Sequence, residues 1–161
     1  MKKYTNFYTK ACEGGRKWLD GLNTDKMEIV VDELLKLNNI DWIVWSLSQP
    51  ETYKLLINRV ADVNATDRDG NTAMIWAAWK GHVETVKLLL DKGADVNAVN
   101  IAGYTALILA ANYGHTETVK LLLDSGANVN IVNRIGNTAL ILAERNGHTE
   151  TVKLLQDIIN K

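Results

Sequence analysis

Hydrophobic positions in the second half of the chain have the spacing of short amphipathic helices. In residues 117–124 the apolar side chains stand three and four positions apart, so they form one stripe on a helix. Residues 105–111 are a shorter and almost wholly apolar stretch. Gly114 and Gly126 follow the two stretches, and glycine accepts the left-handed backbone that ends many helices. The pattern therefore predicts two short helices, each followed by a glycine.

This helix pair recurs with a period of 33 residues. A Gly-His pair marks the period at residues 81–82, 114–115 and 147–148. The units so defined span residues 67–99, 100–132 and 133–161, and the first two are identical at 21 of 33 aligned positions. Because such short helices are unstable alone, each unit has to stack on its neighbours. The period predicts an all-α solenoid of stacked helix-turn-helix units.

The period also extends toward the N-terminus. Residues 61–65 repeat, 33 positions earlier, the segment at 94–98. We therefore expect a degenerate unit at 34–66, preceded by an N-terminal helical cap at 1–33. The last unit, 133–161, is truncated, since it stops before any counterpart of Asn128 to Asn130.

Three short motifs recur in the units. They read Gly-x-Thr-Ala-Leu-x-x-Ala from Gly103, Gly-His-x-Glu-x-Val-Lys-Leu-Leu-Leu from Gly114, and Gly-Ala-Asp-Val-Asn from Gly93. Together these motifs resemble the ankyrin-repeat family over residues 34–161, most clearly from residue 51 onward. The resemblance implies helix-turn-helix units with β-turn tips, and a non-catalytic module that binds a protein partner.

The units depart from that family at the start of their first helix. Where the family has Thr-Pro-Leu-His, this chain has alanine after each threonine and isoleucine at the fourth position. The family's proline preorganises the helix start, and its histidine makes polar contacts between units. We therefore expect weaker local order in the turns, partly offset by burial of the isoleucines.

Residues 1–50 match no repeat. Their apolar spacing predicts helices at 9–22, 27–37 and 41–47. The motif Ala11-Cys12-x-x-Gly15-x-x-Trp18-Leu19, followed by Asp41-Trp42-x-x-Trp45, resembles a small helical module at the front of uncharacterised bacterial and phage proteins. We expect this segment to cover the open end of the stack. A separate recognition domain is the alternative.

Composition and charge exclude several classes of protein. The chain has 161 residues, a formal net charge of -1 and one cysteine, so it holds no internal disulfide. Basic and acidic side chains are balanced in both halves, which argues against a nucleic-acid binder. No apolar core of a signal peptide follows Met1, and no run reaches the roughly 18 apolar residues of a membrane span. We expect a cytoplasmic monomer without nucleic-acid or membrane partners.

Candidate catalytic and metal-binding residues have simpler structural explanations. The histidines at 82, 115 and 148 occupy one repeat position, so they form a ladder with steps of about 8–10 Å, whereas metal ligands lie about 2.1 Å from one ion. Cys12 has no histidine in its half of the chain to activate it. The glycines after Glu13 lack the Lys-Ser/Thr of a phosphate loop. Glu and Lys three positions apart on each second helix form solvated pairs. We therefore expect no enzyme activity, metal ion or cofactor.

Function is expected where the units differ, because their shared residues hold the repeat together. In the ankyrin family, partners are bound by the turn tips and the exposed side of the first helices. The variable positions there are rich in Trp, Tyr and Arg, the residue types that dominate binding hot spots. We predict partner-binding residues at Arg68, Asp69, Asn71, Trp79, Lys80, Ile101, Tyr104, Asn112, Tyr113, Arg134, Ile135, Asn137, Arg145 and Asn146. Trp76 is expected to pack in the core, since it aligns with Leu109 and Leu142.

The preferred function is a non-catalytic protein-protein interaction module that uses its concave face and turn tips. The alternative is an inhibitor or immunity-type protein, related to phage proteins by the motif in residues 1–50, that blocks an enzyme or effector. A third class is self-association through the last unit, which Gln156 opposes because it puts a polar side chain where the other units have leucine. The aromatic side chains at Trp79, Tyr104 and Tyr113 also have a purely structural explanation, namely packing against one another or against the N-terminal helices.

Overall fold

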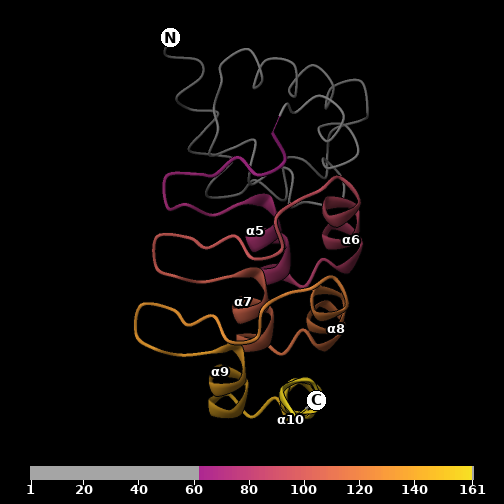
Figure 1. Cartoon of the computed structure of the whole chain (residues 1–161), viewed down its shortest axis with the longest axis vertical. Helices are drawn as coiled ribbons and strands as arrows, with labels where there is room; N and C mark the ends of the chain where they lie inside the picture. Colours follow the sequence, from indigo (N-terminus) through magenta and orange to yellow (C-terminus); the bar gives the residue numbers. More distant parts are fainter. Residues whose placement is uncertain (1–61, 161) are drawn as a thin grey trace, which may run out of the picture. The chain divides into compact units, whose positions relative to one another are not determined.

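The computed structural model describes residues 62–160. They form three helix pairs, α5 (Ala73–Lys80) with α6 (Val83–Asp91), α7 (Ala106–Asn112) with α8 (Thr116–Asp124), and α9 (Ala139–Arg145) with α10 (Thr149–Ile159). Figure 1 shows the first helices of the pairs in one column and the second helices in another, with long loops projecting to one side. The described residues contain no β-strand, and one isolated bridge joins Thr66 to Thr72. The all-α solenoid is confirmed.

Several predictions concern residues that the structure does not describe. They are the N-terminal cap at 1–33, almost all of the degenerate unit at 34–66, the helices at 9–22, 27–37 and 41–47, and Cys12. The unit boundaries at 67–99, 100–132 and 133–161 stay a proposal, and each of these segments holds one helix pair.

A threonine caps the start of each first helix, and an alanine follows it where the family has proline. The side-chain oxygen accepts a hydrogen bond of 3.1 to 3.3 Å from the backbone N–H three residues on, in Thr72, Thr105 and Thr138. This bond satisfies one of the amide groups that a helix start leaves unpaired. The isoleucine that donates it is 1% exposed at Ile75 and Ile108 but 38% exposed at Ile141. The expected burial is therefore confirmed in two units, and Ile141 lacks it because no described helix pair follows.

A glycine and a histidine join the two helices of each pair. Gly114 has a φ of 70°, as its place after α7 predicts. The histidine links successive units, because His115 Nε2 donates to the carbonyl oxygen of Trp79 at 3.1 Å and His148 Nε2 to that of Asn112 at 3.0 Å. A carbonyl only accepts, so Nε2 carries the proton in both rings. The junction role expected of the histidines is thus seen in two of them.

The core lies between the two columns of helices. Small side chains let α5 pack on α7 and α7 on α9, and the fully buried ones include Ala77, Ala78, Ala110 and Ala111. The second helices contribute large buried side chains at Leu89, Leu122 and Leu155. Each such leucine stabilises the stack by about 1.5–3 kcal/mol. The result is a firm scaffold that presents its loops and the outer side of its first helices to solvent.

The loops repeat one turn and are joined to each other. A backbone N–H donates across each turn at 3.0 Å, from Asp67 to Asn71, from Asn100 to Tyr104 and from Asn133 to Asn137. Neighbouring tips are linked by the N–H of Ile101, which donates to the carbonyl of Asp69 at 2.9 Å, and by that of Arg134, which donates to Ala102 at 3.1 Å. The tips therefore form a continuous ladder.

Candidate partner-binding site

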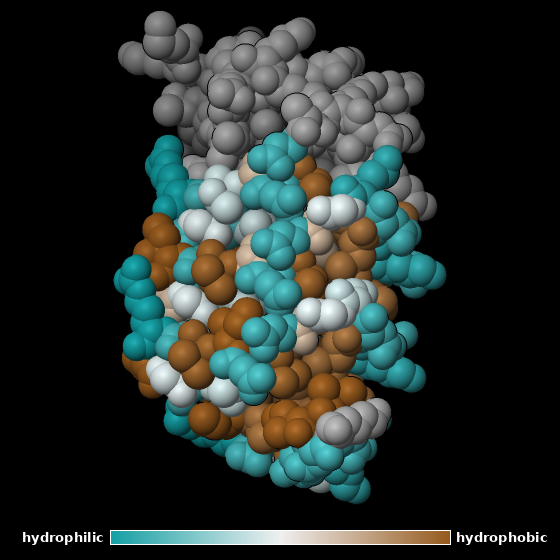
Figure 2. Space-filling model, in the orientation of Figure 1, coloured by the Kyte–Doolittle hydropathy of each residue, from teal (hydrophilic) through white to brown (hydrophobic). Residues whose placement is uncertain are grey.

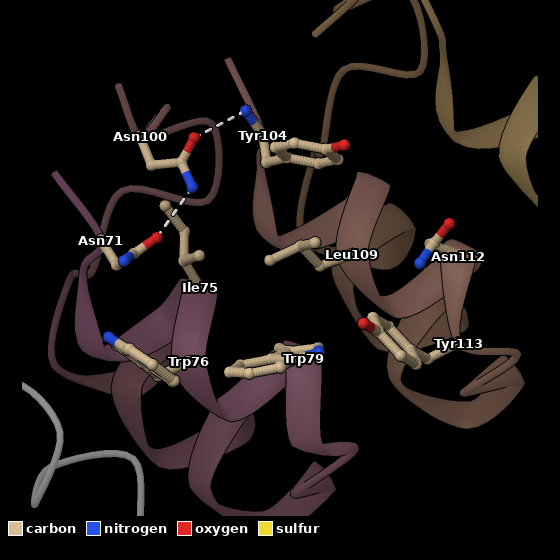
Figure 3. A pocket seen from close by; sticks show the side chains of 9 residues that line it. All are labelled: Asn71, Ile75, Trp76, Trp79, Asn100, Tyr104, Leu109, Asn112 and Tyr113. Atoms are coloured by element: carbon tan, nitrogen blue, oxygen red, sulfur yellow. Dashed lines mark hydrogen bonds between the residues drawn. The ribbon is translucent and has the colours of Figure 1, made fainter. Parts of the chain in front are cut away.

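An open groove lies between the first helices α5 and α7 and the turns that precede them. Its volume is about 270 Å³, and it is lined by Asn71, Ile75, Trp76, Trp79, Asn100, Tyr104, Leu109, Asn112 and Tyr113. Figure 3 shows these side chains arranged around a common space. None of the lining side chains is charged at neutral pH. The groove therefore offers aromatic and aliphatic surface with a few amide and hydroxyl groups.

The indole of Trp76 is held in place by a carboxylate. Its Nε1 donates a 2.8 Å hydrogen bond to Asp67 Oδ2. The same carboxylate accepts from the backbone N–H of Asn71 at 2.8 Å and from its side-chain amide at 3.1 Å. The sequence assigned Trp76 to the core, but the structure places it half-buried on the wall of the groove beside Leu109. An indole is larger than the leucine of the next unit and has a polar edge, so it reaches the turn.

Three aromatic rings that line the groove form a chain, which continues to the ring of His115 outside it. The ring centroids of Trp76 and Trp79 are 5.0 Å apart, and those of Trp79 and Tyr113 are 6.1 Å apart. Tyr113 in turn stacks on His115 at 6.3 Å with an interplanar angle of 16°. The rings do pack against one another, as the purely structural explanation expects, yet Tyr113 remains 49% exposed. Mutual packing restricts the rotamers of these rings.

Lys80 places a positive charge over one of these rings. The Nζ of Lys80 lies 4.0 Å from the centroid of the Trp79 ring, a cation–π contact. Lys80 is itself exposed, and it is the one charged side chain in α5 and α7. The face that these two helices turn to solvent is therefore weakly positive.

The asparagine side chains that line the groove differ in how many of their hydrogen-bonding groups are already paired within the protein. Asn100 Nδ2 donates to Asn71 Oδ1 at 2.8 Å, and Asn100 Oδ1 accepts from the backbone N–H groups of Ala102 and Tyr104 at 3.0 and 2.9 Å. Asn112 Oδ1 accepts from Asn146 Nδ2 at 3.0 Å. Within the described residues, Asn112 Nδ2 has no hydrogen-bond partner, and Figure 3 shows it directed into the groove.

The groove brings together five of the predicted contact residues, namely Asn71, Trp79, Tyr104, Asn112 and Tyr113. It also contains Ile75, Asn100 and Leu109, which comparison of the units missed because each resembles its counterpart in a neighbouring unit. Trp76 has leucine as its counterpart in both other units, so the sequence comparison could have identified it as a variable position on the groove.

The other predicted contact residues lie outside the groove. Exposed side chains at the turn tips are Arg68, Asp69, Ile101, Arg134 and Ile135, of which Ile135 is 75% exposed. Arg145 and Asn146 are exposed at the end of α9. Asn137 differs from the expectation, since it is only 7% exposed and its Oδ1 accepts from Arg145 Nη2 at 3.3 Å. Figure 2 shows hydrophobic side chains gathered over the loops and at the end of the stack formed by α9 and α10.

Two kinds of feature are absent from the described part of the chain. Over residues 62–160, no three His, Cys, Asp or Glu side chains are placed to hold a metal ion. Over the same residues, no helix combines the length and apolar character that crossing a membrane requires.

Comparison with known proteins gives one positive result. The family model described as ankyrin repeats (3 copies) matches residues 25–100 and 97–161. A search of curated proteins finds no match. The two matched segments cover most of the chain and include every helix described above. The chain therefore belongs to the ankyrin-repeat family.

Proposed function

We propose that this protein is a non-catalytic module that binds a protein partner through the groove and the turn tips. Ankyrin repeats are generally protein-protein interaction modules. The observation that carries the proposal is the placement of Trp79, Tyr104 and Tyr113, which line one groove although the other units have polar or charged residues at these positions, asparagine in at least one unit each. The repeat itself therefore does not require an aromatic side chain there.

The chemistry of the groove supports a protein partner. Tryptophan and tyrosine are enriched among the residues that dominate protein interfaces, and in the groove Trp79 and Tyr104 are half-buried while Tyr113 is exposed. The groove is open, and its volume of about 270 Å³ lies at the lower limit of the roughly 300–1,000 Å³ of small-molecule pockets. It suits a few side chains of a larger partner. Ile101 and Ile135, which are 54% and 75% exposed, add apolar contact area at the tips.

The test is affinity capture from lysate of the source cells with three forms of the full chain. One is the wild type, and the second carries Trp79→Asn, Tyr104→Asn and Tyr113→Asn, which take the asparagine of a neighbouring unit. The matched control carries Lys87→Ala, Lys120→Ala and Lys153→Ala on the exposed side of the second helices. Removing several hot-spot residues costs about 4 kcal/mol or more, about a thousandfold in affinity.

We expect a protein that the wild type and the lysine control retain and the asparagine variant loses. Circular dichroism establishes that all three forms are folded. Retention of the same proteins by a folded asparagine variant would overturn the proposal. The identity of the captured protein also distinguishes an inhibitor, which would retain an enzyme or effector, from an adaptor.

A further inference from the structure

We propose that the groove recognises a partner segment that presents a carboxylate next to an apolar side chain. This inference rests on the proposed function and specifies the chemistry of the partner. It is carried by the hydrogen-bonding groups that the protein leaves unused in the groove, and by the charge of the helices around them.

The unused groups are mainly donors. Trp79 Nε1 can only donate, and within the described residues it has no hydrogen-bond partner. Asn112 Nδ2 is likewise left with donor capacity after its Oδ1 has accepted from Asn146. Figure 3 shows the Trp79 nitrogen and the Tyr113 hydroxyl pointing toward each other on one side of the groove, with the Asn112 amide nitrogen turned toward the same space. The two nitrogens require acceptors, and the Tyr113 hydroxyl can donate to the same ligand group.

The charge around this space favours an anionic acceptor. Lys80 Nζ lies 4.0 Å from the Trp79 ring centroid, and α5 and α7 carry no acidic side chain. Asp67 is bound to Trp76 Nε1, which Figure 3 shows on the side of the ring that faces away from Trp79. The carboxylate of Asp67 is thus separated from the donors by the indole of Trp76. A carboxylate gains more from such donors than a neutral carbonyl, because charge-assisted hydrogen bonds are about twice as strong.

The rest of the groove suits an apolar neighbour of that carboxylate. Leu109 lies near its centre in Figure 3, with Trp76 and Tyr104 on its walls. Ile75 also lines the groove but is only 1% exposed, so Leu109 is the aliphatic side chain that a partner can reach. Leu109 is half-buried, so its remaining surface is available for contact. An apolar side chain placed there removes hydrocarbon from water on both partners. The preferred segment therefore combines an acidic residue with an aliphatic or aromatic one.

The test uses short synthetic peptides, acetylated and amidated at their ends so that the side chain is their only carboxylate. Three matched libraries have Glu, Gln or Lys at the centre, flanked by the same mixtures of Leu, Phe and Ser. Binding to the ¹⁵N-labelled full chain is followed by NMR through the indole N–H of Trp79 and the amide of Asn112. We expect the best Glu peptide to bind about tenfold more tightly than its Gln counterpart, and Lys peptides to bind more weakly than both.

Two variants test the source of the preference. Lys80→Ala is expected to weaken Glu peptides about threefold without changing Gln peptides, since an exposed charge contributes modestly. Lys87→Ala removes the same charge from α6 and should change neither. Equal binding of Glu, Gln and Lys peptides in the groove would overturn the carboxylate preference and leave the proposed function standing. If no library perturbs Trp79 or Asn112, the inference fails. In that case the lysate experiment decides separately whether the proposed function fails too.

Discussion

The side-chain amide of Asn100 donates a 2.8 Å hydrogen bond to that of Asn71 in the preceding turn. One unit further along, the equivalent residues are Asn133 and Tyr104. There the amide nitrogen of Asn133 is buried and has no hydrogen-bond partner among the described residues. A buried amide left unpaired costs about 1–3 kcal/mol. Tyr104 thus occupies a position where asparagine would complete the fold, and such local costs are expected at functional sites.

Restoring the asparagine should recover this hydrogen bond. We compare Tyr104→Asn with Tyr104→Ala, because both remove the aromatic ring and only the first supplies an acceptor for Asn133. Tyr104→Asn is expected to have a free energy of unfolding about 1 kcal/mol higher than Tyr104→Ala. Urea denaturation followed by circular dichroism measures the difference. Equal stability of the two variants would show that the unpaired amide is not a cost.

The glycines between the paired helices offer a second comparison. Gly114 and Gly147 have φ values of 70° and 74°, so alanine at either position costs about 1–2 kcal/mol in backbone strain. A Cβ on Gly114 would also lie 2.5 Å from His148 Nδ1, whereas one on Gly147 would meet no atom within 4 Å. Displacing His148 endangers its hydrogen bond to Asn112, so Gly114→Ala should cost at least about 1 kcal/mol more than Gly147→Ala. Equal urea midpoints for the two variants would refute the role given to His148.

Position in the stack should decide the cost of deleting the same side chain. Ile108 is 1% exposed between its neighbours, and Ile141 is 38% exposed in the last pair. Ile108→Ala is expected to lower the free energy of unfolding by about 2–5 kcal/mol. Ile141→Ala should cost less than half as much, because it removes less buried surface and leaves no closed cavity. A cost for Ile141→Ala as large as that for Ile108→Ala would mean that another part of the protein covers Ile141.

The fold was largely predictable because its determinants are local and repeated. Gly114 must follow a helix in a left-handed conformation, and it does so with a φ of 70°. Thr105 precedes an apolar stretch and caps it with a 3.1 Å hydrogen bond to Ile108. The 33-residue period then repeats the same cap and the same glycine in every helix pair. The stacking of α5 on α7 and α7 on α9 follows, since short helices of this kind cannot bury their apolar side alone.

The site was predictable only in part. Comparing the units shows which positions vary in residue type, but it does not show which side chains surround each position or how exposed it is. Trp79 and Tyr113 were found because their counterparts are polar. Asn137 was among the predicted contact residues because it lies at a variable position, but its side chain is only 7% exposed and accepts a hydrogen bond from Arg145. Neither residue type alone indicates that bond. The role of Trp76 depends on the bond between its Nε1 and Asp67, nine residues away, which needs the turn to be in place first.

The central claim is that a protein partner occupies the groove between α5 and α7, and site-specific photo-crosslinking tests it most directly. A photoreactive phenylalanine analogue replaces Tyr113, whose ring is 49% exposed and therefore tolerates the larger group. The control places the same analogue at Lys120, which is exposed on α8. We predict that the captured partner crosslinks from position 113 and not from position 120. Crosslinking from position 120 with none from 113 would contradict the account.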